Sequence, residues 1–353
     1  MTVLKLGSLF DGIGVFPLAA VHCGIEPVWA SEIEARPISI TKRHFPDMLH
    51  LGDITKINGA EVPPVDVITF GSPCQDLSQI GTRNGFAGKK SSLFYQAMRI
   101  IEEMRYATNG RYPAFTVWEN VAGAFSSNDR LDFAAMLRAF TGAEVSVPPR
   151  GWAHAGMVRG GCADTAWRLL DAQYWGEPAL VQRRKRVFVV ADFAGQRAGE
   201  VLFKPRTVLP FSAISGPGGV SATQRGGVPA AQTGRQVPIV RPFSLRRMRT
   251  MAQVGDQKGF CASFGRGGEP FPTLLASVTA PFSFWYEGEE QDGFLRVLTP
   301  LECERLMGLP ENWTKYGCKN EEISDHARYR ALGNSIALPC AEYVMAGIAE
   351  VMN

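Results

Sequence analysis

The sequence has little that could build a disulfide framework or a metal site. Its 353 residues include seven cysteines, at positions 23, 74, 162, 261, 303, 318 and 340, and no pair has the Cys-x-x-Cys spacing. The five histidines do not cluster near them. Disulfide scaffolds and structural zinc sites need paired or grouped ligands. We therefore expect no disulfide and no metal, with at most one reactive cysteine and the others in the core.

Long apolar stretches and targeting signals are also absent. No run reaches the roughly eighteen apolar residues that a transmembrane helix needs. The first residues, Met1–Leu6, read as a strand and lack the basic start, apolar stretch and cleavage site of a secretory signal. These absences predict a cytoplasmic protein with no membrane partner.

The chain also lacks a large excess of positive or negative charge, because the formal net charge is only +3. Basic residues nevertheless gather at Arg183–Arg186 and again at Arg241, Arg246, Arg247 and Arg249. Such clusters are usually solvated faces. Two of them in a nearly neutral chain modestly favour a polyanionic partner.

The first part of the chain alternates short apolar runs with helical stretches. Runs typical of buried strands occur at Val3–Phe10, Pro27–Ser31, Val65–Phe70 and Ala114–Trp118. Helical patterns lie between them at Phe16–Cys23, Ala35–Phe45 and Ser91–Arg105. This order predicts an α/β fold with a doubly wound, mostly parallel sheet. Two further strands, Trp167–Trp175 and Arg186–Ala191, are expected as an antiparallel pair at one edge.

Composition divides the chain into three parts. Residues 1–200 form the predicted sheet domain. From Phe203 to about Phe284 the chain is rich in Gly, Pro, Ser and Thr, without a long helical period. This predicts a small, loop-rich domain over residues 201–318, which includes a hinge. Residues 319–353 form a C-terminal segment that returns to the first domain.

Two helices are expected near the C-terminal end. Thr299 is a plausible N-cap, with Pro300 at the first helical position and Glu302 at the third, and Gly308 ends that helix. The second helix covers Ser335–Met352. We find no internal repeats.

A glycine-containing loop follows the first predicted strand and opens a helix. Gly12 and Gly14 would let the backbone approach a ligand beside the positive end of a helix dipole. Glu32 comes twenty residues after Gly12, where it could reach a ribose, and Asp53 could take an adenine amino group. No third glycine completes a dinucleotide fingerprint, so a nucleoside cofactor without phosphate is favoured. The alternative is a strand–helix turn without a ligand.

A cysteine follows the third predicted strand, on a loop at its carboxyl end. Such loops build active sites in parallel sheets. The polar and turn-forming residues around Cys74 are not typical of a core, although most single cysteines are buried structural residues. A chemical role and a structural role therefore remain open for Cys74 on this pattern.

Two more polar elements adjoin predicted strands. Glu119 directly follows Trp118 at the end of an apolar strand, where it could keep a proton or could simply be solvated. The basic segment Gln182–Arg186 precedes another strand and, taken alone, reads as a solvated turn.

Taken together, these segments resemble the DNA cytosine-5 methyltransferase family. The similarity covers nearly the whole chain except its middle, and the matches come in the family's order. They are Phe10–Gly14, Glu32, Gly52–Ile54, Gly71–Gln75, Ser92–Phe94, Glu119–Val121, Gln182–Arg186, Arg296–Gly308 and Leu332–Ser335. The succession of Pro-Cys-Gln, Glu-Asn-Val, Gln-Arg-Arg-x-Arg and Gly-Asn-Ser is very specific.

The resemblance implies a catalytic set. Cys74 would add as a thiolate to carbon 6 of a flipped-out cytosine, so that carbon 5 can attack the methyl sulfonium of S-adenosylmethionine. Glu119 would hold N3 and the exocyclic amino group. Arg184 and Arg186 would position the base and phosphate, and Arg186 could orient Glu119.

The resemblance also implies binding residues. Those expected at the cofactor are Phe10, Asp11, Gly12, Ile13, Gly14, Glu32, Asp53, Ile54, Pro73, Asn334, Ser335 and Ile336. Those expected at double-stranded DNA are Gln75, Ser78, Gln182, Thr273 and Leu274. We expect a monomer, and any cognate restriction endonuclease would act independently.

The chain departs from the family at Ser8 and Val15, where Asp and Gly are frequent, which leaves the fine cofactor contacts open. A tRNA methyltransferase of the same fold is one alternative, although the long segment Phe203–Phe294 favours DNA. A catalytically inactive DNA-binding regulator is another, but it predicts loss of Cys74 or Glu119. A nicotinamide oxidoreductase would need the phosphate-binding fingerprint that is missing.

Overall fold

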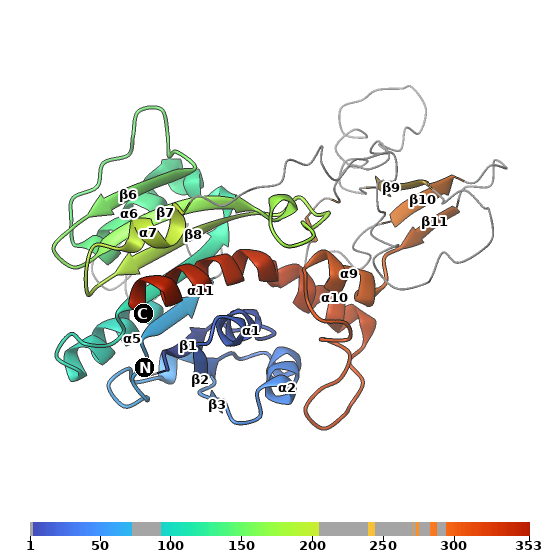
Figure 1. Ribbon diagram of the computed structural model, residues 1–353, viewed down its shortest axis with the longest axis horizontal. Coiled ribbons are helices and arrows are strands. Elements are labelled where there is room, and N and C mark those ends of the chain that lie inside the picture. Colours follow the sequence, from blue (N-terminus) through green and yellow to red (C-terminus); the bar gives the residue numbers. More distant parts are fainter. Residues whose placement is uncertain are drawn as a thin grey trace. The chain divides into compact units, whose positions relative to one another are not determined.

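The structure is a computed structural model that describes residues 3–72, 93–204, 239–243, 271, 273–274, 283–287 and 294–353. The chain divides into two compact units (Figure 1). Unit 1 comprises Met1–Leu170, Lys185–Arg206 and Leu338–Asn353, and unit 2 comprises Asp171–Arg184 and Thr207–Ala337.

Unit 1 is built on an eight-stranded sheet with the order β3-β2-β1-β4-β5-β8-β7-β6. Five strands run parallel to one another: β1 (Lys5–Leu9), β2 (Glu26–Ser31), β3 (Leu49–His50), β4 (Val67–Phe70) and β5 (Phe115–Val121). β8 (Lys185–Asp192) runs antiparallel to β5, and β6 (Ala155–Arg159) antiparallel to β7 (Asp164–Asp171). The predicted α/β class with a mostly parallel sheet is confirmed.

Helices cover both faces of this sheet. α5 (Leu93–Ala107) and α6 (Leu131–Thr141) enclose the main core with Phe70, Trp118 and other buried strand residues. On the opposite face, α11 (Leu338–Met352) lies beside α1 (Val15–His22) and α7 (Ala198–Leu202) (Figure 1). α2 (Ala35–His44) follows β2. The described part of unit 1 also contains the 3₁₀ turns η1 (Ile54–Lys56), η3 (Ala122–Phe125) and η4 (Ser127–Arg130), whereas η5 (Ala172–Tyr174) belongs to unit 2.

Unit 2 contains a small antiparallel sheet with the order β11-β10-β9. Its strands are β9 (Ile239–Phe243), β10 (Ser283–Glu287) and β11 (Phe294–Val297), and the described part of the unit also contains the helices α9 (Pro300–Leu306) and α10 (Asp325–Asn334). α9 begins at a capping box, in which the Thr299 side chain accepts from the Glu302 N–H and the Glu302 carboxylate accepts from the Thr299 N–H. The predicted cap of this helix is therefore confirmed.

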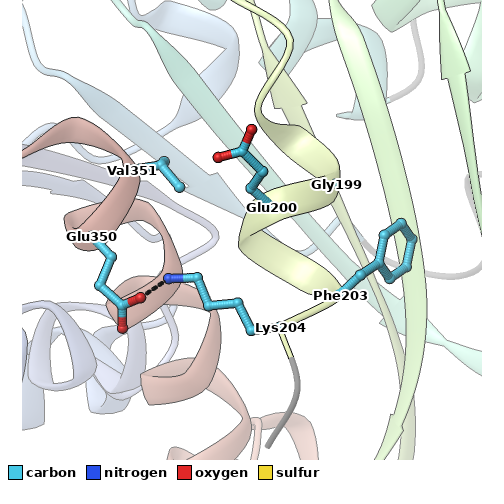
Figure 2. A pocket seen from close by; sticks show the side chains of 6 residues that line it. All are labelled: Gly199, Glu200, Phe203, Lys204, Glu350 and Val351. Carbon is cyan, nitrogen blue, oxygen red and sulfur yellow. Dashed lines mark hydrogen bonds and ion pairs between the residues drawn. The ribbon is translucent and has the colours of Figure 1, made fainter.

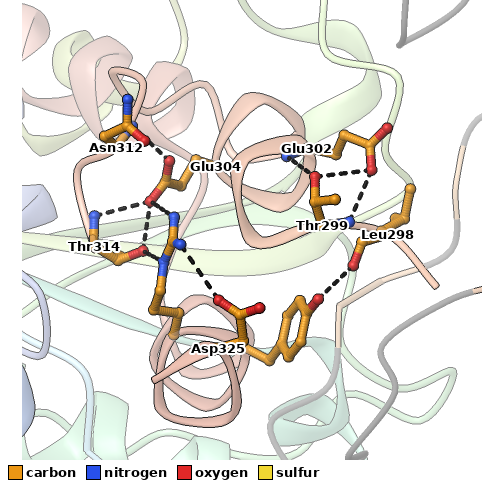
Figure 3. A network of polar contacts seen from close by, with 9 residues as sticks. Leu298, Thr299, Glu302, Glu304, Asn312, Thr314 and Asp325 are labelled. Carbon is orange, nitrogen blue, oxygen red and sulfur yellow. Dashed lines mark hydrogen bonds and ion pairs between the residues drawn. The ribbon is translucent and has the colours of Figure 1, made fainter. Parts of the chain in front are cut away.

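A buried network ties α9 to α10 within unit 2 (Figure 3). The Glu304 carboxylate is fully buried and accepts from Arg328 Nη2 at 3.1 Å and from the Thr314 N–H at 2.9 Å. Arg328 Nε also donates to Thr314 Oγ1 at 3.0 Å. The buried charge of the carboxylate is thus compensated by Arg328, and its oxygens are hydrogen-bonded, as a buried ion requires.

Some sequence expectations differ from the structure. The expected C-terminal segment 319–353 is divided, because α10 belongs to unit 2 and α11 to unit 1. Asp171–Arg184 also belongs to unit 2. Not all of the other cysteines fill the core, since Cys162 and Cys318 are exposed whereas Cys303 and Cys340 are buried.

No single helix in the described part of the chain is both long and apolar enough to cross a membrane, and only the consecutive pair α10 and α11 reaches that length and composition when taken together. Among the same residues, no group of three or more His, Cys, Asp or Glu side chains could hold a metal ion.

Candidate active site

The carboxyl ends of β1, β2, β3, β4 and β5 share one edge of the sheet, because these strands are parallel. From β1 the chain adds β2 and β3 on one side and then returns to add β4 and β5 on the other side. The strand order therefore reverses at β1. Ligands of open α/β sheets bind at such a switch point. The predicted Gly12 loop, Glu32 and Asp53 follow these strands, and Glu119 lies in the last residues of β5.

The loop after β1 has an unusual backbone. Phe10 has φ 54°, Gly12 has φ 60° and Gly14 has φ 78°, all in the left-handed region. Glycine adopts this region without a steric penalty, whereas Phe10 does so at some cost. An added Cβ at Gly14 would lie 3.2 Å from both Phe45 and Thr41, so the loop also lies close to α2.

The carboxylate of Glu32 organises this loop. Its Oε2 accepts from the Gly12 N–H at 3.0 Å, and its Oε1 accepts from the N–H groups of Ile33 at 2.7 Å and Glu34 at 3.0 Å. A carboxylate has about four lone-pair sites. Glu32 therefore retains capacity for a further donor such as a ribose hydroxyl, and its charge next to Gly12 disfavours a phosphate there.

Asp11 faces the space between the loop and α2. Its Oδ2 accepts from Thr41 Oγ1 at 3.2 Å, and its Oδ1 is shielded from solvent. Burial of the carboxyl and the nearby charge of Glu32 raise the pKa of Asp11 to about 7. Asp11 therefore titrates near neutral pH.

Asp53 stands at the end of β3 as the N-cap of η1. Its Oδ1 accepts from the Thr55 N–H at 3.0 Å and from Thr55 Oγ1 at 2.8 Å. These hydrogen bonds lower the pKa of Asp53 below its usual value. The group is thus an ionised acceptor, suited to an amino group, and the neighbouring Ile54 is buried.

The ends of β4 and β5 are joined by side-chain hydrogen bonds. Asn120 Nδ2 donates to the Ser72 carbonyl at 2.9 Å, and Trp118 Nε1 donates to Ser72 Oγ at 3.1 Å. A Cβ added to Gly71 would lie 3.2 Å from Glu119 Oε2. The backbone that leads out of β4 therefore lies directly against the Glu119 carboxylate.

Glu119 forms an ion pair with Arg186. Arg186 Nε lies 3.0 Å from Glu119 Oε1, and both side chains are mostly buried. The two residues lie diagonally across the β5–β8 pair, where Glu119 is opposite Phe188 and Arg186 opposite Val121. Diagonal neighbours on one face of a sheet are within reach of long side chains. The structure thus brings together two of the expected catalytic residues.

The resemblance implies DNA contact for Gln182 and positioning of the base and phosphate for Arg184. Both belong to unit 2 and are buried there, with 0% and 1% relative exposure. Their segment pairs with the segment around Phe271: Phe271 N–H donates to the Val181 carbonyl at 2.7 Å, and Arg183 N–H donates to the Phe271 carbonyl at 2.6 Å. The pairing turns alternate side chains inward, which leaves Arg183 exposed.

The remaining expected residues fall into three groups. In unit 2, Thr273 is half-buried, Leu274 is buried, Asn334 is exposed, and Ser335 and Ile336 follow α10. Ile13 is buried in unit 1. Pro73, Cys74, Gln75 and Ser78 lie outside the described residues.

Two contributors were missed from the sequence. Thr41 lies in the middle of α2, where no local pattern marks a hydroxyl that reaches Asp11. Asp171, whose Oδ1 accepts from the Arg184 N–H at 3.0 Å, is a strand-end carboxylate without a distinctive neighbour in sequence.

A surface pocket elsewhere in unit 1 is not a candidate for this site. Figure 2 shows it between α7 and α11, lined by Gly199, Glu200, Phe203, Lys204, Glu350 and Val351. Lys204 and Glu350 form an ion pair there. The pocket includes none of the residues that follow the ends of β1 to β5.

Comparison with known proteins agrees with the site. A family model described as C-5 cytosine-specific DNA methylase matches residues 4–204 and 243–350, which is nearly all of the chain.

Individual relatives are distant but extensive. The type II methyltransferase M.HhaI of Haemophilus parahaemolyticus is 23% identical over 100% of this chain and 96% of its own length. A protein of Escherichia phage P1 named DNA N-6-adenine-methyltransferase is 24% identical over 98% of this chain. This chain spans only 61% of that protein, whose name refers to another base.

A solved structure supports the fold. The Dnmt2 methyltransferase of S. pombe superposes with a TM-score of 0.59 over 99% of both chains, at 16% sequence identity.

Proposed function

Since the chain belongs to the C-5 cytosine-specific DNA methylase family, and is thus a DNA (cytosine-5)-methyltransferase, we propose that Cys74 is its nucleophile and Glu119 its base-holding carboxylate. The observation that carries this proposal is the contact between the end of β4 and Glu119. Gly71 lies against the Glu119 carboxylate, and Asn120 holds the Ser72 carbonyl at 2.9 Å. Cys74 follows Ser72 by two residues, which span at most about 7 Å of chain.

The proposed reaction uses covalent catalysis. The Cys74 thiolate adds to carbon 6 of cytosine, and the ring electrons move to carbon 5, which becomes nucleophilic. S-adenosylmethionine, when bound, supplies an electrophilic methyl group on its sulfonium. The proton on carbon 5 is then removed and Cys74 leaves by elimination, which restores the aromatic ring.

Glu119 and Arg186 have complementary roles in this proposal. Glu119 holds N3 and the exocyclic amino group of the cytosine, so it stabilises the charge that develops in the ring. Arg186, 3.0 Å from Glu119, fixes the orientation of that carboxylate. Because carbon 5 is inaccessible in a stacked duplex, the cytosine must leave the helix.

The residues at the edge of β1, β2 and β3 fit a nucleoside cofactor without phosphates. Gly12 donates its N–H to Glu32 and not to an open anion site, and Glu32 retains acceptor capacity for a ribose. Asp53 would accept from an adenine amino group beside Ile54. We assign Phe10, Asp11, Ile13, Gly14, Pro73, Asn334, Ser335 and Ile336 to the same cofactor site.

We assign DNA contacts to Gln75 and Ser78, which follow the nucleophile, and to Thr273. Gln182 and Leu274 are buried within unit 2. We therefore assign them a structural role in the packing around Thr273 and not a contact with DNA. The DNA is a duplex from which one cytosine is extruded.

The test is a covalent trap. A duplex in which 5-fluorocytosine replaces every cytosine is incubated with the enzyme and S-adenosylmethionine, because fluorine at carbon 5 blocks the elimination step. We expect an enzyme–DNA adduct that survives denaturing electrophoresis and maps to Cys74. The Cys74→Ser variant serves as the control: it should bind cofactor normally and form no adduct.

The absence of an adduct, under conditions in which ordinary duplex DNA is methylated, would contradict the mechanism. Transfer of labelled methyl groups to duplex DNA and to tRNA is measured in parallel. Methylation of tRNA alone would contradict the DNA substrate.

A further inference from the structure

The Arg184 guanidinium donates hydrogen bonds to three backbone carbonyl groups. Its Nη1 donates to the Leu274 carbonyl at 3.0 Å, and its Nη2 donates to the Gly333 carbonyl at 3.0 Å and to the Ser335 carbonyl. The side chain is 1% exposed. We propose that Arg184 is a positioning residue, which fixes the Gly333–Ser335 turn for cofactor binding and does not contact DNA. This inference rests on the proposed cofactor role of Ser335.

The Gly333 and Ser335 carbonyls lie at the end of α10, which runs to Asn334. The last carbonyl groups of a helix have no partner within the helix and carry its negative dipole end. A buried guanidinium both donates hydrogen bonds to them and compensates that partial charge. Arg184 is thus the C-terminal cap of α10, supplied by a distant segment.

The rest of α10 is fixed independently. Arg328, in its first turns, is buried against Glu304 and Thr314, and Tyr329 Oη donates to the Leu298 carbonyl at 2.6 Å (Figure 3). Removal of the Arg184 guanidinium should therefore loosen the turn at Ser335 and leave the helix in place. This separation allows local and global effects to be distinguished.

Arg184 itself is held firmly. Its N–H donates to Asp171 Oδ1 at 3.0 Å, and Thr273 Oγ1 donates to the carbonyl of Arg183 at 2.6 Å. Contact with a phosphate or a base would require the guanidinium to leave three carbonyl groups in a buried site, and unpaired buried acceptors are costly. A positioning role avoids that cost.

The neighbouring Arg183 offers a matched control. It is exposed, its backbone makes the same segment pairing, and its charge is the same. If the cluster acts through charge alone, the two arginines should behave alike. If the carbonyl contacts matter, only Arg184 should affect the turn.

The experiment uses the full chain with Arg184→Lys, Arg184→Gln and Arg183→Gln. Affinity for S-adenosylmethionine and S-adenosylhomocysteine is measured by equilibrium dialysis. Hydrogen exchange is followed by mass spectrometry in cofactor-free protein, over peptides that contain residues 332–337. Binding to a labelled duplex is measured as a function of salt.

Both Arg184 variants should bind both cofactors about tenfold or more weakly, the effect expected when buried acceptors lose their donor. Exchange should accelerate over 332–337 and stay unchanged over α9, and the salt slope of DNA binding should be unchanged. Lys keeps the charge but lacks the planar fork, so it should not restore the turn. Arg183→Gln should leave cofactor affinity and exchange unchanged.

Two results would overturn the inference. One is unchanged cofactor affinity and exchange in Arg184→Lys and Arg184→Gln. The other is a salt slope reduced by about one in Arg184→Gln, the mark of a lost phosphate contact. Failure of the fluorocytosine trap would refute the proposed nucleophile, whereas the exchange measurement in cofactor-free protein would still test the cap.

Discussion

The carboxyl group of Asp11, in the loop after β1, accepts a hydrogen bond from Thr41 Oγ1 at 3.2 Å. Burial raises its pKa to about 7, assisted by the charge of Glu32, while the hydroxyl groups of Ser8 and Thr41 oppose the rise. Between its ordinary value near 4 and this raised value, the folded protein binds a proton that the unfolded chain has released. The stability of the folded state therefore falls as pH rises through this window.

We predict that Asp11→Asn removes this dependence. The Tm of the variant relative to that of the wild type should rise by about 2 °C or more between pH 5 and pH 7. Above pH 7 this difference should stay constant. Thermal unfolding at several pH values measures the difference. Asp53→Asn is the control, because a lowered pKa acts below pH 4 and should give a constant offset from pH 5 to 8. Parallel wild-type and Asp11→Asn curves would count against the assignment.

The arginines of the segment Gln182–Arg186 show what sequence can and cannot predict for a single residue. The resemblance assigned positioning of the base and phosphate to both Arg184 and Arg186, and orientation of Glu119 to Arg186 as well. Arg186 does meet Glu119. The acceptors of Arg184 are backbone carbonyls 90, 149 and 151 residues away, which leave no trace in residue types.

At the scale of elements, the ends of β4 and β5 approach unusually closely. The residue at position 71 has space for a hydrogen and little more, because an added Cβ would lie 3.2 Å from Glu119 Oε2. Such a contact is tighter than ordinary van der Waals packing, so a larger residue must displace the carboxylate or the loop.

We predict that Gly71→Ala lowers kcat by about tenfold or more, since sub-ångström misplacement of a catalytic group is costly, with little change in cofactor affinity. Gly123→Ala is the matched control, because its Cβ would meet Val121 Cγ2 at an ordinary 3.6 Å. Single-turnover methylation and equilibrium dialysis measure the two quantities. Equal activity of Gly71→Ala and wild type would show that Glu119 tolerates displacement.

The elements were predictable where apolar residues dominate. β1, β2, β4, β5 and β8 were found from buried runs. β6 was missed because its residues alternate between exposed and half-buried, and α10 because polar contacts around Arg328, and not an apolar stripe, hold it. α6 was also missed, although its buried residues, including Phe133, Met136 and Phe140, recur at helical spacing.

For the whole molecule, binding to DNA must come from local basic groups, because the net charge is only +3. We predict that affinity for a duplex falls steeply with salt, by about tenfold or more between 50 and 200 mM, as bound counterions are released. Fluorescence anisotropy with a labelled duplex measures this dependence. Cofactor affinity, measured over the same range, should change much less. A flat salt response would argue against phosphate contacts.

The pairing of α1 with α11 has a consequence for biosynthesis. His22 and Glu342, which join these helices at 2.6 Å, are 320 residues apart. The buried face of α1, including Phe16 and Leu18, is therefore synthesised long before its cover emerges from the ribosome. Until α11 is synthesised, this apolar face stays exposed in the nascent chain and is prone to aggregation. A chain that terminates before α11 would leave the face uncovered and would not form the complete enzyme.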